Sequence, residues 1–395
     1  MLLVACGPGG TRPTAPASSV GARGGTLNAS AAPSAAAAAH PVSAGSAGAP
    51  TAGTNGSPAN APGLTGIWMV SAADGWATGP AGIYHTSDGG RRWQDVTPAG
   101  VGLSSGHPAF LGDAAWVFSA QACSVFATTD GGAHWSHSAP LVPADAGTLS
   151  RLQCTLPVEM AFGNGQSGLL GFGPPAMQMA MTALYATTDG GTSWHLVTRT
   201  PPVLMFASLG AALFAGDSPD PGGQFTPGPA PGIPWLSSDG GGNWSVAPVR
   251  YPTAVHLGAP GVMPVQIVGA GSAGGTALIA MTYGQSLWLE RVGDGGSLWT
   301  APGPALPLTG TPRVSVVSAS AAFVLMAGTL SATLDGGAAW TRVAAQPALA
   351  AGDRISFVSA TQGWALDPTA RTLWTTTDGG RLWTALPYRL TATAP

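Results

Sequence analysis

Seven aspartates are the residues whose type and spacing could do chemistry. Each stands in the pattern Ser/Thr-x-Asp-Gly-Gly-x-x-Trp, and one copy has Val292 in place of the hydroxyl residue. A calcium loop needs acidic or amide residues at alternate positions and a closing Glu, and these copies have neither. We therefore predict structural turns at Asp88, Asp130, Asp189, Asp239, Asp294, Asp335 and Asp378.

Each position of the pattern has a physical reason. Asp-Gly-Gly supplies residues that tolerate positive φ, which tight turns between twisted strands require. The carboxylate and the hydroxyl two residues earlier can accept hydrogen bonds from the turn's own backbone N–H groups. The Trp falls in the returning strand, where its ring can fill space between sheets.

The pattern resembles the Asp-box, also called the bacterial neuraminidase repeat, of sialidases, sortilin-type receptors and photosystem II assembly factor propellers. Residues 67–77 and 355–365 also resemble the strand, turn and Gly-Trp-Ala of the photosystem-factor group. The resemblance covers residues 64–390 and implies a propeller. It says little about activity, because one fold hosts many functions.

The spacing of the turns agrees with that fold. Seven turns over this region give about 47 residues per unit, which suits the four short strands of a propeller blade. In the first unit we expect strands over 66–71, 75–78, 83–86 and 92–97, and the last unit repeats this over 354–386. The sequence thus predicts an all-β fold, a seven-bladed β-propeller with four-stranded antiparallel blades, preceded by a disordered N-terminal segment.

A sialidase-like hydrolase is the alternative that the resemblance raises. That family uses an arginine triad on the substrate carboxylate, a Tyr–Glu pair as nucleophile and an Asp as acid/base, and other glycosidases use two carboxylates. The family's Phe/Tyr-Arg-Ile-Pro motif is missing, and the chain has only two glutamates, Glu159 and Glu290. We therefore expect no catalytic residues.

Other chemistries find little support in the sequence. His134 and His137 have a spacing that puts them on opposite faces of a strand, so they cannot share a metal. Three alternating methionines, Met177, Met179 and Met181, are compatible with a soft metal but suit packing better. No Gly-x-Ser-x-Gly elbow occurs. We expect no cofactor and no metal.

The long connections between strands form the surface on which we expect a partner. In a four-stranded blade they lie on the face opposite the seven turns, and function usually sits on loops held by a rigid frame. Exposed Arg and Tyr side chains anchor partners. The candidates that fall in or beside these connections are Arg151, Arg250, Tyr251, Arg313 and Arg354.

The N-terminal residues are typical of a tethered lipoprotein. Leu3-Val4-Ala5-Cys6 matches a lipobox, although too few residues precede Cys6 for a complete signal. Residues 7–62 are almost wholly Ala, Gly, Ser, Pro and Thr, a composition that cannot bury enough apolar surface to offset its ordering entropy. We assign residues 1–6 to a truncated signal, 7–62 to a disordered tether and 64–390 to the propeller; a low-complexity extension without a tethering role is the alternative.

Composition excludes some partners. The chain has 14 basic residues against 17 acidic ones, and the basic residues are scattered arginines, whereas nucleic-acid binding requires a basic cluster. No apolar run is long enough for a spanning helix. Membrane contact is therefore expected only through Cys6.

With Cys6 assigned to lipid, Cys123 and Cys154 are the remaining thiols. Two remaining cysteines in an exported chain favour a disulfide between them. Both residues fall in connections of one face at adjacent blades, so we expect their α-carbons within about 4.4 to 6.8 Å. Two buried free thiols in a cytoplasmic protein are the alternative.

We expect a monomeric, extracytoplasmic, lipid-anchored scaffold that is not an enzyme. Its partner is a protein or a glycan on the face opposite the turns, and the resemblance to the photosystem-factor group implies a role in assembly of a membrane complex. A sialidase-like glycoside hydrolase or glycan-binding protein is the alternative.

Overall fold

The computed structural model describes residues 63–80, 82–102, 108–141, 154, 158–172, 183–197, 203–209, 212–217, 235–239, 243–253, 255, 265–273, 276–293, 298–300 and 302–392. Contacts divide the chain into two units, Met1–Ser57 and Pro58–Pro395, and every described residue lies in the second. Both predicted N-terminal segments, including Cys6, therefore lie outside the described residues. Within the described part all regular structure is β, and no helix there has the length and hydropathy needed to cross a membrane.

The described strands form seven sheets, numbered here in chain order. Sheet 1 contains β1 (Gly66–Met69), β2 (Gly75–Gly79), β3 (Gly82–Thr86), β4 (Arg92–Asp95) and β30 (Arg389–Thr391). Sheet 2 contains β5 (Ala109–Leu111), β6 (Ala114–Ser119), β7 (Ser124–Thr128) and β8 (Ser136–His137). Sheet 3 contains β9 (Val158–Phe162), β10 (Gly168–Phe172), β11 (Ala183–Thr187) and β12 (His195–Leu196).

The remaining sheets follow the same order of strands. Sheet 4 contains β13 (Val203–Leu209), β14 (Ala212–Asp217), β15 (Trp235–Ser237) and β16 (Ser245–Val246). Sheet 5 contains β17 (Gln266–Ala273), β18 (Thr276–Tyr283), β19 (Ser286–Gly293), β20 (Leu298–Trp299) and β21 (Leu306–Pro307). Sheet 6 contains β22 (Arg313–Val316), β23 (Ala322–Met326), β24 (Thr329–Thr333) and β25 (Thr341–Val343), and sheet 7 contains β26 (Arg354–Phe357), β27 (Gly363–Asp367), β28 (Thr372–Thr376) and β29 (Thr384–Leu386).

The second strand is fully buried in sheets 3 and 6. All five residues of β10 and of β23 are buried, and their sequences, GLLGF and AFVLM, are continuous apolar runs without polar alternation. Continuous apolar runs of this kind are typical of strands whose sheet is covered on both faces. Both sheets must therefore pack against a neighbour on either side.

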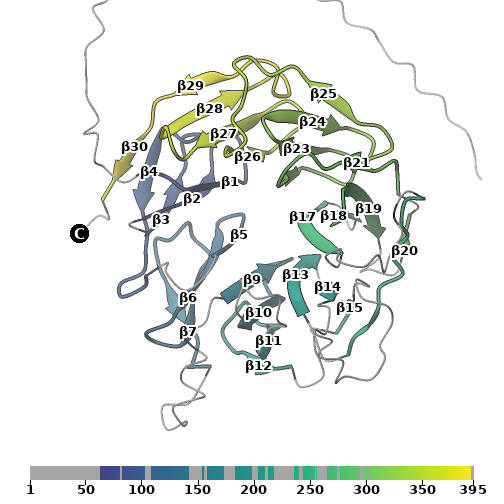
Figure 1. Ribbon diagram of the computed structural model, residues 1–395. Helices are drawn as coiled ribbons and strands as arrows, with labels where there is room; N and C mark the ends of the chain where they lie inside the picture. Colours follow the sequence, from purple (N-terminus) through teal and green to yellow (C-terminus); the bar gives the residue numbers. More distant parts are fainter. Residues whose placement is uncertain are drawn as a thin grey trace, which may run out of the picture. The chain divides into compact units, whose positions relative to one another are not determined.

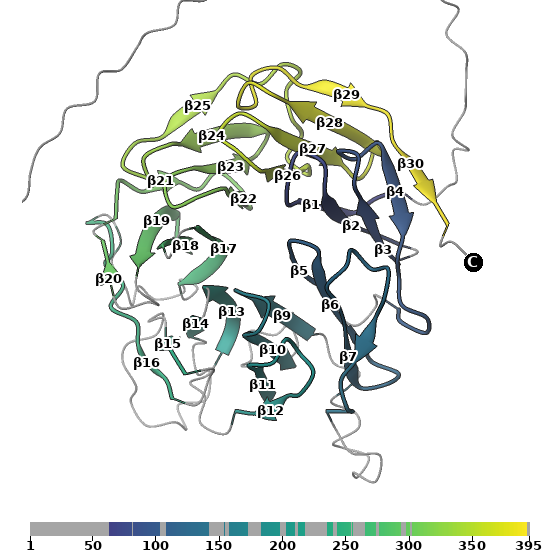
Figure 2. The same cartoon turned by 180° about the vertical axis from the view of Figure 1, so that it is seen from behind.

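The first strands of the sheets surround a common centre. In chain order β5, β9, β13, β17, β22, β26 and β1 contact one another in succession, and Figures 1 and 2 show them innermost, with the later strands of each sheet further out. We call these seven the inner strands. Sheets arranged radially in this way, each with its four strands meandering outward, make an all-β propeller with four-stranded blades.

Aromatic side chains fill the space between neighbouring sheets. Trp116 of sheet 2 stacks on Phe162 of sheet 3 with ring centroids 3.7 Å apart, and Phe323 of sheet 6 stacks on Phe357 of sheet 7 at 3.6 Å. Each pair belongs to a buried apolar cluster drawn from both sheets. The core is therefore divided into layers between sheets.

Sheet 7 is joined to sheet 1 by polar contacts as well as by apolar packing. The Ser356 hydroxyl accepts a hydrogen bond from the Met69 backbone N–H at 2.8 Å. Beyond sheet 7 the chain continues into β30, which pairs in parallel with β4 on the outer edge of sheet 1 (Figure 1). The sequence did not indicate this strand. The four strands expected in the first unit are present, with ends displaced by up to two residues, and the four strands of the last unit span Arg354 to Leu386 as expected.

Candidate functional site

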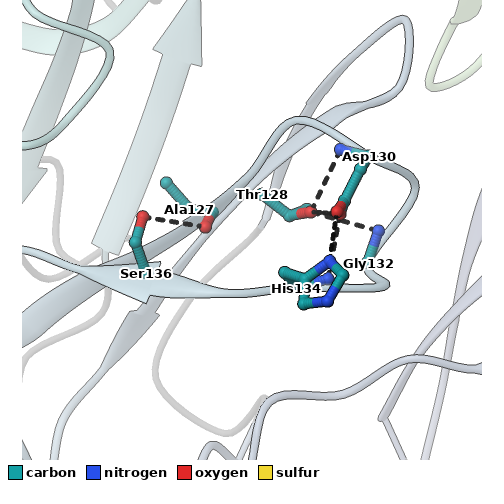
Figure 3. A network of polar contacts seen from close by, with 6 residues as sticks. All are labelled: Ala127, Thr128, Asp130, Gly132, His134 and Ser136. Atoms are coloured by element: carbon teal, nitrogen blue, oxygen red, sulfur yellow. Dashed lines mark hydrogen bonds and ion pairs between the residues drawn. The ribbon is translucent and has the colours of Figure 1, made fainter.

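The turn around Asp130 shows how the repeated pattern uses its polar atoms (Figure 3). The Thr128 hydroxyl donates to Asp130 Oδ1 at 2.8 Å and accepts from the Gly132 N–H at 3.1 Å. Asp130 Oδ1 also accepts from the His134 N–H at 2.9 Å, and Oδ2 lies 2.7 Å from His134 Nδ1. These bonds hold the pKa of Asp130 down to about 2, the His134 backbone N–H being the largest cause.

The same bonds recur in the other described copies. The carboxylate accepts from the backbone N–H four residues later in the turns of Asp88, Asp189, Asp239, Asp335 and Asp378. The glycines after Asp88 have φ of 74° and 91°, which an L side chain rarely adopts. Asp294 lies outside the described residues. Because turn donors occupy the carboxylates, and because no group of three metal-ligating side chains occurs among the described residues, these aspartates are turn residues in this structure.

The repeated turns lie at one end of the inner strands. In five sheets the first glycine of the turn donates its N–H to the hairpin between the first and second strands, as Gly89 does to Ala73 and Gly379 to Thr361. The other end of an inner strand, where it begins, is therefore the end away from the repeated turns. This second end is the candidate site.

Charged residues occupy one equivalent position at the start of three inner strands. Strand pairing aligns Phe162, Val316 and Phe357, because each faces the first residue of the second strand. Three residues earlier stand, in sheets 3, 6 and 7 respectively, Glu159, Arg313 and Arg354. All three side chains are half-buried. In sheet 1 the same position is Gly66.

Arg313 and Arg354 are close enough to affect each other's charge. Their strands, β22 and β26, are neighbours in the ring. Burial lowers the pKa of Arg354 from its ordinary value, and the charge of Arg313 lowers it further. Arg313 Nε and Arg354 Nη1 are buried atoms without a hydrogen-bond partner. Unused donors on two partly desolvated cations have the chemistry needed to bind an anion.

The acidic residue next to this pair in the chain, Asp353, forms no ion pair with it within the described residues. Asp353 precedes Arg354, but its Oδ2 accepts from the Ala350 N–H at 2.9 Å. Burial raises the pKa of Asp353. In sheet 3, whose inner strand contacts β5 and β13 and not β22 or β26, burial raises the pKa of Glu159 to about 7.

A second group of ionisable residues, whose association the sequence did not indicate, lies between sheets 4 and 5. Glu290 of β19 is fully buried, and neither carboxyl oxygen has a hydrogen-bond partner by distance and angle. The rings of Tyr251 and Trp288 pack against each other with centroids 5.9 Å apart, and the Tyr251 hydroxyl and Trp288 Nε1 are also buried. Burial raises the pKa of Glu290 to about 8, although the nearby Arg250 opposes the shift.

This group bears on two of the sequence predictions. Tyr251 is a half-buried packing residue whose pKa is raised by burial and by Glu290, so it does not present a free hydroxyl to a partner. Glu290, the other carboxyl considered for a glycosidase, has no exposed surface in this structure. Arg250 is exposed beside it. Arg151 lies outside the described residues.

The disulfide expected from the sequence is present. Cys123, in the turn between β6 and β7, is bonded to Cys154, and their α-carbons are 5.4 Å apart. Both belong to the buried cluster between sheets 2 and 3. The bond joins the ends of a segment whose middle, residues 142–153, lies outside the described residues.

The solved structures that resemble this chain share little of its sequence. The sequence matches no protein-family model and no curated protein. Among solved structures, YCF48 bound to D1 peptide has 16% identity and a TM-score of 0.46 over 80% of this chain and 91% of that chain. YCF48 from Cyanidioschyzon merolae has 15% identity and a TM-score of 0.46 over 80% and 94%, and a GH74 xyloglucanase from Xanthomonas campestris has 14% identity and a TM-score of 0.36 over 82% and 72%.

Proposed function

We propose that this chain is a non-catalytic binding propeller of seven blades, one for each sheet, whose repeated turns are Asp-boxes. Its partner is a protein with an acidic segment, held at the start of the inner strands by Arg313 and Arg354. The observation that carries the proposal is the pair of buried, unpartnered guanidinium nitrogens on neighbouring inner strands. A carboxylate there would satisfy both donors and relieve the repulsion between the two cations.

The test is the affinity of the full chain for a fluorescein-labelled hexaglutamate peptide, measured by fluorescence anisotropy. We expect Arg313→Gln and Arg354→Gln each to weaken binding by about tenfold or more, since a hydrogen bond to a charged group contributes about 1.5 to 3 kcal/mol. Arg342→Gln is the matched control, because Arg342 is an exposed arginine on the outer strand β25. Equal affinity for hexaglutamate and hexalysine, or equal losses in all three variants, would refute the proposal.

Glu159 is the residue that keeps a glycoside hydrolase as the second candidate function. Glu159 shares the register position of the two arginines, and its pKa of about 7 suits a general acid. Hydrolysis would require a second carboxylate at a suitable separation. Release of fluorophore from a fluorogenic sialoside or xylo-oligosaccharide, lost in Glu159→Gln, would establish catalysis and displace the binding proposal.

We also propose that the protein is extracytoplasmic, monomeric and anchored to the membrane by lipid on Cys6. The buried Cys123–Cys154 disulfide supports an oxidising compartment. Expression with an upstream signal and metabolic labelling with a palmitate analogue tests the anchor. Label that persists in Cys6→Ala would rule it out.

A further inference from the structure

Trp68 is the exposed aromatic side chain of an inner strand. It is the third residue of β1, and 40% of its surface is accessible, whereas Ile67 and Met69 on either side are buried. Two aromatic residues of other inner strands, Phe162 and Phe357, are instead buried and stack on rings of a neighbouring sheet. The exposed face of this indole makes no packing contact with the described residues that would stabilise the fold.

Gly66 makes room for the Trp68 ring at the start of the strand. A Cβ at position 66 would stand 2.5 Å from Cη2 and 2.7 Å from Cζ3 of Trp68. The ring therefore lies against Gly66, the sheet 1 counterpart of Arg313 and Arg354. Trp68 thus occupies, in sheet 1, the end of the inner strands where the arginines of sheets 6 and 7 begin.

The Trp68 ring packs against an aromatic residue of sheet 2. Its centroid is 5.1 Å from that of Phe110 on β5, and Phe110 stacks on the buried Trp76 at 5.2 Å with an interplanar angle of 14°. The Met69–Ser356 hydrogen bond fixes β1 beside β26, which carries Arg354. Trp68, Arg354 and Arg313 therefore lie at the same end of three consecutive inner strands, β1, β26 and β22.

We propose that this row, Trp68 followed by Arg354 and Arg313, is a specificity site for a peptide segment that places an aromatic or aliphatic side chain next to acidic residues. The inference rests on the proposed function and adds the apolar group to it. Trp and Arg are the residues that most often dominate protein–protein affinity. The apolar side chain of the peptide would cover the open indole face while its carboxylates meet the two guanidinium groups.

Two labelled peptides test the inference on the full chain: hexaglutamate, and the same peptide with Phe in place of one internal glutamate. The Phe peptide is expected to bind about tenfold more tightly than hexaglutamate, because one well-packed apolar contact at the centre of an interface increases affinity by about that factor. Trp68→Ala should remove that gain and leave the hexaglutamate affinity unchanged. Leu196→Ala, an exposed apolar residue on the outer strand β12, should change neither.

Gly66→Ala provides a second route in case Trp68→Ala does not fold. The added methyl group must displace the indole, so this variant should also lose the preference for Phe while keeping Trp68. Equal affinities of the two peptides for the wild type, with both lost in Arg354→Gln, would overturn the Trp68 inference and leave the proposed function intact. Absence of binding by either peptide would overturn both.

Discussion

The indole N–H of Trp364 donates a 3.0 Å hydrogen bond to the carbonyl oxygen of Gly89, 275 residues earlier in the chain. Trp116 makes the same kind of bond to Gly190 in the interface between sheets 2 and 3, at 2.8 Å. The interface that closes the ring is thus built like one formed by consecutive sheets. Gly89 belongs to a repeated turn, so the turn of one sheet also binds its neighbour.

Trp364→Phe should therefore weaken ring closure while conserving most of the ring's packing. The change leaves the buried Gly89 carbonyl without its donor, which costs about 1 to 3 kcal/mol of unfolding free energy. Urea unfolding followed by circular dichroism measures the loss. Trp374→Phe is the control, because that indole is only half-buried; an equal loss in both variants would contradict a specific role for the Trp364 bond.

Asp189→Ala should lower the melting temperature by about 2 to 4 °C, because the turn loses the acceptor for several donors. The Ser193 N–H and hydroxyl both donate to this carboxylate. Peptide affinity should stay unchanged, since the turn lies at the far end of the inner strands. Scanning calorimetry measures the melting temperature, with Asp113→Ala as the control because the Asp113 side chain is exposed. Loss of peptide affinity with an unchanged melting temperature would refute the assignment of Asp189 to a structural turn.

Stability should fall as pH rises through the range set by Glu290. Its folded pKa of about 8 lies above the ordinary value of 4.5, so the folded state holds the proton more tightly than the unfolded state. The contribution of Glu290 to the free energy of unfolding is complete below the pKa of the unfolded state, and it is lost as pH rises through the pKa of the folded state. Glu290→Gln should flatten the dependence of the melting temperature between pH 5 and about 9; a variant curve parallel to that of the wild type would show that Glu290 does not titrate there.

Loss of the disulfide should destabilise the fold without changing its strands. The bond closes a loop with a sequence separation of 31, and the chain entropy of such a closure corresponds to about 3 to 4 kcal/mol. Comparing unfolding of the wild type with Cys123→Ser/Cys154→Ser measures the effect. Two reactive thiols in the denatured, unreduced wild type would mean that the cysteines are not paired.

The sequence predicted most of the local structure, because the repeated turns mark where strands end and return. It placed Arg313 and Arg354 in or beside connections, and the structure makes them the first residues of β22 and β26. Their common register with Glu159 depends on how three separate sheets pair, which no local pattern reports.

Two features had no sequence signal. Trp68 reads as a core residue of an apolar strand, and its exposure depends on Gly66 and on the support of Phe110. Glu290 reads as a polar residue of an outer strand, and it is buried because the segment that carries Tyr251 covers it. Both outcomes arise from contacts between distant segments.

The central claim is that Arg313 and Arg354 together bind a carboxylate, and an experimental structure of the full chain with hexaglutamate tests it most directly. We expect one carboxylate with oxygens about 2.7 to 2.9 Å from Arg313 Nε and Arg354 Nη1. A bound peptide elsewhere on the propeller, with both nitrogens still unpartnered, would contradict the account.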